Sequence, residues 1–202
     1  MTEGAFRKRD YRVCEITPRM ARAFIRQHHY SGGMSNTGTH FHGLFKVDGF
    51  DLLGVAAWLP PTRAAAETVN KENWQRVLSL TRLAIHPDVP TNGASFLMAA
   101  SMRMIEQEQK WVSLVTYADT FRGHTGAIYR AANWTYEGVT APTTRWENAD
   151  GRQIARKSTK SRTKAQMEAL GLRMVGAFPK HKFVKHLHQR RQPERQVFRL
   201  VG

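Results

Sequence analysis

The first thirty residues follow the period of a strand and then that of a helix. Residues 11–16, "YRVCEI", alternate between apolar and polar side chains, which predicts a strand. Thr17 and Pro18 are typical of a helix N-cap and a first helical residue, so we predict a helix from Pro18 to about Gln27. The residues of this helix that we expect to be buried are Met20, Ala23 and Phe24.

The middle of the chain predicts a hairpin and then a strand–helix–strand unit. Residues 40–47 and 52–59 are apolar runs on either side of "DGFD", a sequence typical of a hairpin turn. Residues 77–85 favour a strand, residues 94–109 a largely buried helix, and residues 111–118 a central strand rich in β-branched side chains. A helix between two strands of one sheet implies a parallel pair with a right-handed crossover.

The last third of the chain predicts shorter elements. Residues 123–132 fit a helix, and residues 133–140 and 144–156 indicate a further hairpin or ribbon. Residues 163–171 fit a short helix that stops at its glycine, and residues 181–187 fit a last, basic strand.

Together these elements predict an α/β fold in a single domain, residues 1–202. We expect a mixed, mostly antiparallel sheet with a central parallel pair, flanking helices and a basic C-terminal extension. In an open sheet of this kind, ligands bind at the carboxyl ends of the parallel strands. The loops His86–Gly93 and Asp119–Gly123 follow those strands, so we expect the functional site there.

The positive charge of the chain is concentrated near its C-terminus. The formal net charge is +15, and residues 151–202 hold fourteen Lys or Arg and two acids, a net +12. A compact cationic segment attracts polyanions by releasing their counterions. We therefore predict double-stranded DNA as the partner, with residues 151–202 in contact with it. The alternative is a basic segment that serves solubility alone.

The apolar runs, the N-terminal segment and the single cysteine indicate the cellular compartment of the protein. No apolar run approaches the roughly 20 residues that span a bilayer, and "MTEGAFRKRDYRV" contains no apolar signal-peptide core. Cys14 is the single cysteine, which excludes a disulfide within one chain and suits a reducing compartment. We expect a cytoplasmic protein without a membrane partner. The sequence leaves open whether it forms a homodimer.

Residues 117–134, "YADTFRGHTGAIYRAANW", gather polar side chains at the end of a predicted strand. Asp119 is a candidate ligand or catalytic carboxylate, or the cap of the following helix. Tyr129 is a candidate catalytic phenol, or a core tyrosine whose hydroxyl has a partner. We interpret His124 as a supporting residue or a phosphate contact.

Three further residues are candidates for binding a donor molecule. Arg82 lies on a predicted central strand, where a charge must be paired or directed at a ligand. Its alternative is a buried ion pair. Gly93 and Ser95 begin the long helix and, with Ala94, offer backbone N–H groups to a phosphate. The alternative for Ser95 is helix capping.

The order of elements resembles the GNAT acyltransferase fold. "YRAANW", residues 129–134, resembles the Tyr-x-x-x-Gly-Phe motif of that superfamily, with Asn133 and Trp134 in the last two places. This resemblance implies that Tyr129 is a general acid that protonates a leaving thiolate. It also implies a pyrophosphate loop before the crossover helix, where this chain has "PTNGASF" with one glycine.

Several segments together resemble the phage Mom-type DNA-modification proteins. They are "HHYSGG", "LSLTRLAIHP", "NGASFL", "VTYADTFRGHTGAIYRAANW" and "PKHKFVKHL", and they cover roughly residues 25–187. The resemblance implies conversion of adenine in DNA to an N6-acetamido or methylcarbamoyl form that shields phage DNA from host restriction. It also implies iron and acetyl-CoA, or a related acyl donor, as cofactors. The residues that it implicates are His29, Tyr30, Arg82, Ser95, Asp119 and Tyr129.

Adenine's exocyclic amine is a poor nucleophile because its lone pair is delocalised into the ring. Catalysis must then act on the electrophile or through a metal-centred step. His29, Tyr30 and Asp119 offer nitrogen, phenolate and carboxylate donors, a set suited to iron with open positions. The alternative for His29 and Tyr30 is a structural pair. We predict Tyr30, Asp119 and Tyr129 as the catalytic residues.

Two further groups are weaker candidates. His40 and His42 share one face of a strand, and we expect them to face solvent rather than to form a second metal site. An enzyme that acts on a DNA base must extrude it and hold it by stacking. The aromatic residues that we predict as walls of such a pocket are Trp58, Trp74, Phe121 and Trp134.

Two other functions remain possible from the sequence. An ordinary GNAT N-acetyltransferase for a protein or a small amine would bind acetyl-CoA strongly and need no iron. A non-catalytic DNA-binding protein on a GNAT-like scaffold would tolerate Asp119→Ala without loss of any phenotype.

Overall fold

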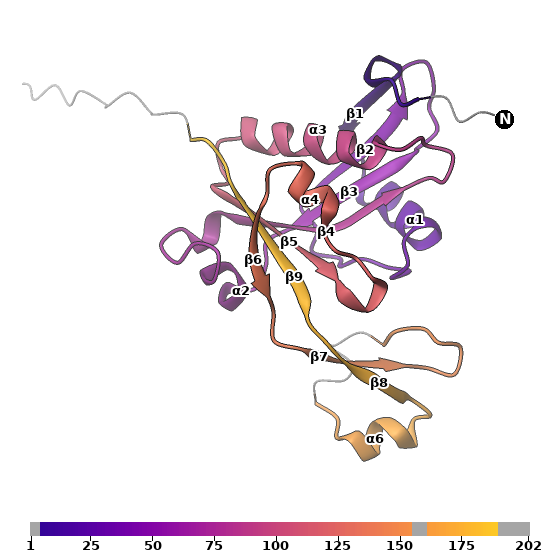
Figure 1. The fold of residues 1–202 in the computed structure, drawn as a ribbon. Helices are drawn as coiled ribbons and strands as arrows, with labels where there is room; N and C mark the ends of the chain where they lie inside the picture. Colours follow the sequence, from indigo (N-terminus) through magenta and orange to yellow (C-terminus); the bar gives the residue numbers. More distant parts are fainter. Residues whose placement is uncertain (1–4, 155–160, 190–202) are drawn as a thin grey trace, which may run out of the picture.

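The computed structural model describes residues 5–154 and 161–189 (Figure 1). Its main body is a seven-stranded sheet in the order β1-β2-β3-β4-β5-β9-β6. Every neighbouring pair is antiparallel except β4 and β5, which are parallel, so the predicted mixed sheet is confirmed. The strands are β1 (Tyr11–Glu15), β2 (His40–Lys46), β3 (Gly54–Leu59), β4 (Val77–Ile85), β5 (Ser113–Asp119), β6 (Thr135–Val139) and β9 (Lys180–His186).

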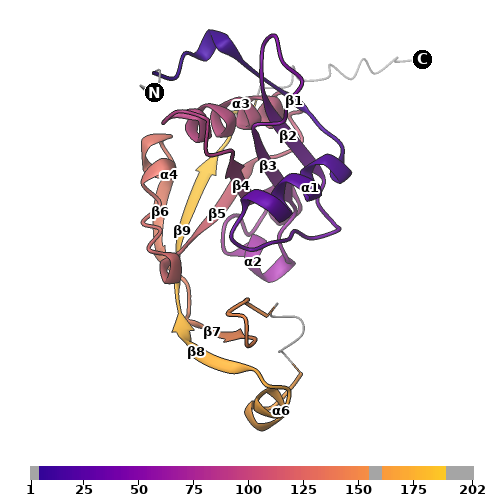
Figure 2. The same ribbon diagram turned by 90° about the vertical axis from the view of Figure 1, so that its right-hand side faces the viewer.

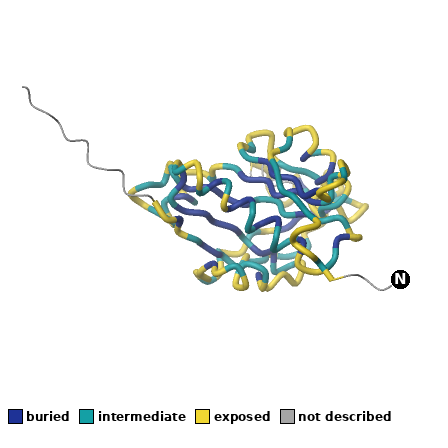
Figure 3. The backbone as a smooth tube through the Cα atoms, turned by 90° about the horizontal axis from the view of Figure 1, so that it is seen from above, coloured by how far each residue is buried: buried dark blue, intermediate teal, exposed yellow. Residues whose placement is uncertain are grey.

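Helices cover both faces of this sheet (Figures 1 and 2). α1 (Pro18–His28) and α2 (Arg63–Glu67) lie on one face, and α3 (Gly93–Gln107) and α4 (Ala127–Ala131) lie on the other. Figure 3 shows the buried stretches running through the centre of the body, with exposed loops around them. In residues 5–154 and 161–189, no helix is both long and apolar enough to cross a membrane.

The buried face of α1 is displaced by one position along the chain from the predicted face, and the two share only Phe24. Thr17 caps the helix as predicted, but the buried side chains are Ala21, Phe24 and Ile25. Met20 is 39% exposed, and Ala23 is also exposed. Apolar residues occupy both candidate stripes of this helix, so the sequence pattern alone does not select one. Packing against β2 and β3 selects the stripe that contains Ile25.

The C-terminal part of the chain forms a second, two-stranded sheet that projects from the body (Figures 1 and 2). β7 (Thr143–Glu147) pairs antiparallel with β8 (Arg173–Phe178), and α6 (Lys164–Ala169) lies between them in sequence. We refer to the described residues of this part, 143–154 and 161–178, as the ribbon. The hairpin predicted from residues 133–140 and 144–156 is wrong, because β6 pairs with β9 of the main sheet. Pro142 stands between the two sheets, where a residue without N–H cannot extend a ladder.

A β-bulge on β4 changes which face of the sheet its side chains meet. Leu80 is opposite Trp58 and Arg82 is opposite Ala57, so Thr81 is an extra residue. Extra residues of this kind disturb the alternation of a strand. Leu80 packs in the core under α3, whereas Ala84 packs under α1. Arg82, two residues before Ala84, therefore points to the α1 face.

The expectation that His40 and His42 face solvent is wrong for His42. Its side chain is 1% exposed, and its Nδ1 lies 2.6 Å from Ser101 Oγ on α3. Ser101 Oγ also accepts the indole N–H of Trp58 at 2.7 Å, which leaves its own hydrogen to donate to His42. Burial lowers the pKa of His42 to about 4. His40 lies 3.1 Å from Glu108.

Because the pKa of the buried His42 is lowered, we expect the protein to lose stability in mild acid. Its pKa is lower in the folded state, so the unfolded chain binds the proton more tightly. Stability from this group is fully present above about pH 6.5 and is lost as the pH falls towards 4, by about 3 kcal/mol in total. Urea unfolding from pH 7 to 4 should show this slope in the natural chain and a shallower one in His42→Gln. Equal slopes would contradict the prediction.

The helix predicted over residues 123–132 begins only at Ala127. Gly126 before it has φ +76°, a left-handed conformation in which side chains are strained. A Cβ added there would overlap the ring of Phe183, which is fully buried. Gly123 also has positive φ, +70°, but open space around it.

These two glycines form a matched pair for a stability measurement. Alanine at either position should cost about 1–2 kcal/mol for the left-handed backbone. Gly126→Ala should cost roughly 1–3 kcal/mol more, because its Cβ must displace the Phe183 ring. Urea titration of Gly126→Ala and Gly123→Ala isolates the packing effect. The prediction fails if the two variants unfold at the same midpoint.

Candidate active site

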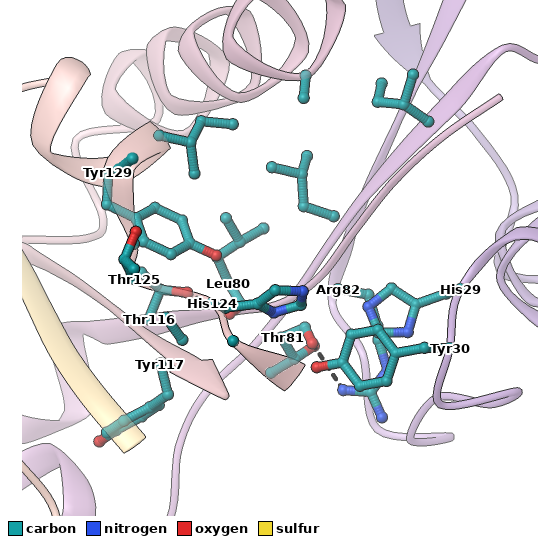
Figure 4. A pocket seen from close by; sticks show the side chains of 18 residues that line it. His29, Tyr30, Leu80, Thr81, Arg82, Thr116, Tyr117, His124, Thr125 and Tyr129 are labelled. Carbon is teal, nitrogen blue, oxygen red and sulfur yellow. Dashed lines mark hydrogen bonds between the residues drawn. The ribbon is translucent and has the colours of Figure 1, made fainter. Parts of the chain in front are cut away.

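A cavity of about 490 Å³ opens where β4 and β5 diverge (Figure 4). The two strands pair only from Val77 and Ser113 to Leu80 and Thr116, and their carboxyl ends part beyond that point. The cavity lies at the carboxyl ends of these strands, as predicted, but of the two predicted loops its lining includes only Gly123. Its lining on the α3 side is apolar and includes Leu83, Ile85, Ala94 and Ile128, and its lining on the α1 side is polar and includes His29, Tyr30 and Arg82.

His29 and Tyr30 lie side by side where the chain leaves α1 (Figure 4). Their rings stack with centroids 4.2 Å apart. His29 Nδ1 accepts the backbone N–H of Ser31 at 3.1 Å, so the neutral ring carries its proton on Nε2. Burial first, and then the charges of Arg82 and His124, lower the pKa of His29 to about 4. This imidazole is therefore neutral at neutral pH.

Tyr30 is 48% exposed and projects its hydroxyl towards the centre of the cavity (Figure 4). His124 meets its ring edge-on at 5.5 Å, and the Arg122 guanidinium lies 5.2 Å from the ring centroid. Burial and then the charge of Asp119 raise the pKa of Tyr30, while Arg82 opposes this shift. Tyr30 is therefore a neutral phenol.

Tyr129 faces these residues from α4, on the other side of the cavity (Figure 4). Burial raises the pKa of Tyr129, and a hydrogen bond with Thr116 opposes the shift. Thr116 Oγ1 in turn donates to the Leu80 carbonyl oxygen at 3.1 Å, at the last paired position of β4 and β5. The phenol is thus protonated and held at the point where the strands part.

Arg82 links the strand to the loop after α1. Its Nε donates to the Gly33 carbonyl oxygen at 2.8 Å, and its Nη1 donates to the Thr81 carbonyl oxygen at 2.6 Å. Burial lowers the pKa of Arg82, and Tyr30 opposes this shift. The ion-pair alternative is not observed, because no carboxylate of the described chain lies within 4.0 Å. The guanidinium places a positive charge near the Tyr30 phenol.

Asp119 lies at the end of β5 and is 8% exposed. Its Oδ1 accepts the backbone N–H of Phe121 at 3.1 Å, so it caps the 3-10 turn Thr120–Arg122. Asp119 therefore acts as a cap, but of this short turn rather than of the following helix, α4, as the alternative had it. Asp119 lines a second cavity rather than the first, although its charge acts on Tyr30.

The side chains present do not fit the iron site implied by the resemblance. His29 Nδ1 is occupied by the Ser31 N–H, and its Nε2 carries the proton. Tyr30 is a neutral phenol in this structure and would have to lose its proton to bind a metal, and Asp119 lines another cavity. Residues 5–154 and 161–189 contain no group of three or more His, Cys, Asp or Glu placed to hold a metal ion. We derive no step through iron.

The start of α3 provides fewer donors than predicted. Gly93 donates its N–H to the Pro90 carbonyl oxygen at 3.1 Å, so this donor is occupied. A Cβ on Gly93 would overlap Val89, which explains the glycine by packing. Ala94 lines the cavity, whereas the Ser95 side chain does not. The N–H groups of Ala94 and Ser95 lie in the first turn, where no earlier helical carbonyl accepts from them.

Two of the predicted aromatic walls and part of the predicted DNA contacts have structural roles instead. Trp58 and Trp134 belong to the core, whereas Phe121 lines the second cavity. Lys182 forms an ion pair with Glu137 at 2.8 Å. The basic residues that remain exposed in the ribbon and at the start of β9 are Arg152, Arg162, Lys164, Arg173 and Lys180. Residues 155–160 and 190–202 of the predicted DNA-contact segment lie outside the described residues.

Sequence analysis missed several residues of the site. Thr116, which holds Tyr129, was detectable as a polar residue on the face of a central strand that otherwise packs in the core. Arg122 was detectable as a cation next to an aromatic residue in the loop after β5. Arg145 and its buried partner Glu147 had no sequence signal, because β7 was assigned to the wrong pairing.

Solved structures with the same arrangement define the class of fold. The ribosomal-protein-S18-alanine N-acetyltransferase of Escherichia coli matches over 93% of this chain and 99% of its own, with TM-score 0.52 and 11% identity. A protein of Desulfovibrio desulfuricans, assigned to the GNAT family of acetyltransferases, matches over 88% and 99%, with TM-score 0.52 and 12% identity. A Bacillus subtilis acetyltransferase, solved in complex with CoA, matches over 88% and 98%, with TM-score 0.52 and 8% identity. The chain has a GNAT-like fold.

Within that class, the sequence identifies the family. The profile of the Mom protein family matches residues 10–192, so this chain belongs to the Mom protein family. The resemblance inferred from the sequence segments is thus confirmed. A search of curated protein sequences finds no match to the chain.

Because Arg82 donates a hydrogen bond to Gly33, we expect its removal to loosen the loop after α1. Arg82→Met keeps a long apolar stem but removes the hydrogen bond to Gly33. Loss of this charge-assisted hydrogen bond should lower the free energy of local opening of the loop by about 1.5 kcal/mol. Backbone amides of residues 31–38 should then exchange with deuterium roughly tenfold faster. Arg63→Met is the control, since its pair with Glu67 is on the surface. Unchanged exchange in this loop would show that Arg82 does not fix it.

Proposed function

We propose that this protein is a transferase that modifies the N6 amine of adenine in DNA. The adduct is of the acetamido or methylcarbamoyl type, and it protects phage DNA against restriction in the host cytoplasm. Membership of the Mom family and the GNAT-like fold support a transferase. The observation that carries the proposal is the cavity at the parting of β4 and β5, with the Tyr129 phenol in its wall.

The α3 side of the cavity suits the donor molecule. Its apolar lining would hold a thioester chain, and the first turn of α3 at Ala94 would face the phosphates. Acetyl-CoA or a related acyl donor is the group that fits this arrangement. The GNAT-like fold and the Bacillus subtilis structure in complex with CoA support this choice.

Tyr129 is the proton donor in this proposal. Burial keeps its phenol protonated, and Thr116 fixes its direction. A donor whose leaving group departs as an anion would take the phenolic proton at the parting of the strands. The positive charge of Arg82 and the neutral phenol of Tyr30 lie on the opposite wall, where they would stabilise negative charge on the reacting group.

DNA would approach from the side that carries the ribbon. The exposed cations Arg152, Arg173 and Lys180 lie on the ribbon and at its junction with β9. Such side chains contact phosphates, which supplies affinity without sequence choice. The net +12 of residues 151–202 supports the same orientation.

The direct test is to express the protein in a bacterial host, digest the DNA to nucleosides and weigh them by mass spectrometry. A modified deoxyadenosine should appear with the natural chain. Tyr129→Phe should reduce its amount by roughly 10²–10⁴-fold, because the general acid is removed without a change of shape. Tyr30→Phe and Asp119→Ala should also reduce it.

Tyr11→Phe is the matched control, since Tyr11 stacks on Phe6 at 4.5 Å, far along the chain from the cavity lining. It should leave the modification at the level of the natural chain. Unmodified nucleosides together with acetylated peptides would favour an N-acetyltransferase that acts on proteins. Modification that survives Tyr129→Phe would remove the acid role from this residue.

A further inference from the structure

A second cavity, of about 510 Å³, lies between the end of β5 and the ribbon. Its lining includes Tyr117, Asp119, Phe121, Arg145, Gln153 and Lys180. Tyr117 lines this cavity and also the first one. The two cavities therefore adjoin at the carboxyl end of β5. The inference below rests on the proposed function.

The second cavity opens on the polar side of the sheet. Val115 of β5 packs with Ala66 of α2. Side chains two residues apart on a strand share a face, so Tyr117 and Asp119 point to that same face. It is the face of α1, to which Arg82 also points. A ligand in this cavity would thus approach the reaction centre opposite to the donor held by α3.

Arg145 gives this cavity an unused hydrogen-bond donor. Its guanidinium is 4% exposed and lies 3.9 Å from the ring centroid of Phe121. Nε donates to Glu147 Oε1 at 2.7 Å, and Nη1 donates to Gln153 Oε1 at 3.1 Å. Nη2 lies 2.7 Å from the same Glu147 oxygen, yet it makes no hydrogen bond of good geometry within residues 5–154 and 161–189.

Nη2 carries two N–H groups. Even if one of them is directed at the Glu147 oxygen, the other has no acceptor within residues 5–154 and 161–189. A buried N–H without an acceptor is destabilising, by about 1–3 kcal/mol, and in native structures it needs an explanation. The carboxylate of Glu147 pairs with Arg145 and also, at 3.9 Å, with Arg173. The carboxylate of Asp119 lines the same cavity and would repel an anion, so a neutral acceptor fits the cavity better.

Asp119 supplies a hydrogen-bond acceptor in the same cavity. Among the described residues, its hydrogen bonding engages Oδ1, which accepts from Phe121. The second carboxylate oxygen can accept from a ligand N–H. Tyr117 and Phe121 add aromatic surface next to these polar groups. Donor, acceptor and aromatic surface together suit a neutral planar heterocycle that carries an amino group beside a ring nitrogen.

We propose that this second cavity is the acceptor subsite, which holds an amino-substituted nucleobase extruded from DNA. Asp119 accepts a hydrogen bond from the exocyclic amine, and Arg145 donates one to a ring acceptor. Lys180, exposed at the junction of ribbon and sheet, contacts a neighbouring phosphate. The shared wall at Tyr117 brings the amine to the edge of the donor cavity.

The test uses the full chain and two single-stranded oligonucleotides, one with adenine and one with hypoxanthine at the same positions. Hypoxanthine replaces the amine with a carbonyl oxygen, which Asp119 would repel. The natural chain should bind the adenine strand about tenfold more tightly, the usual effect of one mismatched base contact. Fluorescence anisotropy at fixed salt measures both affinities.

Two variants and one control make the result specific. Ala65→Trp fills the cavity and should abolish the preference, while salt-dependent binding of both strands remains. Ala64→Trp, at the neighbouring exposed position of α2, is the control and should keep the preference. Asp119→Asn should reverse it, because the amide N–H can donate to the carbonyl of hypoxanthine. A role of Asp119 in capping alone would not reverse it.

The subsite is overturned if the natural chain binds the adenine and hypoxanthine strands equally. It is also overturned if Ala65→Trp or Asp119→Asn still prefers the adenine strand as the natural chain does. These outcomes are separable from failure of the proposed function. Full modification of cellular DNA by Ala65→Trp would remove the subsite and leave the DNA-modifying activity. A preference that the variants change as expected, together with unmodified nucleosides in cells, would keep the subsite and remove the transferase assignment.

Discussion

The parting of β4 and β5 is the constraint on which the site depends. The two strands hydrogen-bond as a parallel pair only as far as Leu80 and Thr116. Beyond that point each strand supports a different part of the cavity. β4, through its bulge at Thr81, turns Arg82 towards α1, while β5 holds Tyr129 through Thr116. A continuous ladder would close this space and leave no route between the two faces of the sheet.

Burial gives the cavity an unusual electrostatic character. His29, Tyr30 and Tyr129 are all neutral at neutral pH, because burial is the largest cause of the pKa shift of each. The charge on the polar wall comes from Arg82. Protonated phenols beside a cation stabilise negative charge that develops on a bound group. The phenols would have to lose their protons before they could bind a metal.

Sequence reasoning succeeded where local pattern and final environment agree. The strand at residues 77–85 was predicted with the observed bounds, because its apolar residues are enclosed on both faces. It failed on α1, where two stripes of the helix are equally apolar. It also failed where residues far apart in the chain bury a polar side chain. His42 is the clearest case, since Ser101 and Trp58 satisfy it from α3 and β3. A strand alternation cannot show which face another helix will cover.

The sequence by itself determined the order of the main-sheet strands along the chain, the cationic end of the chain and the family, because these depend on local composition and on segments such as "YRAANW". Only the tertiary structure decided that Asp119 lines a second cavity, together with Arg145, rather than the cavity that His29 lines. The reason is that strand register, a bulge and the docking of the ribbon fix the direction of a side chain. Each of these arises from contacts between residues far apart in the chain, which a local pattern does not encode.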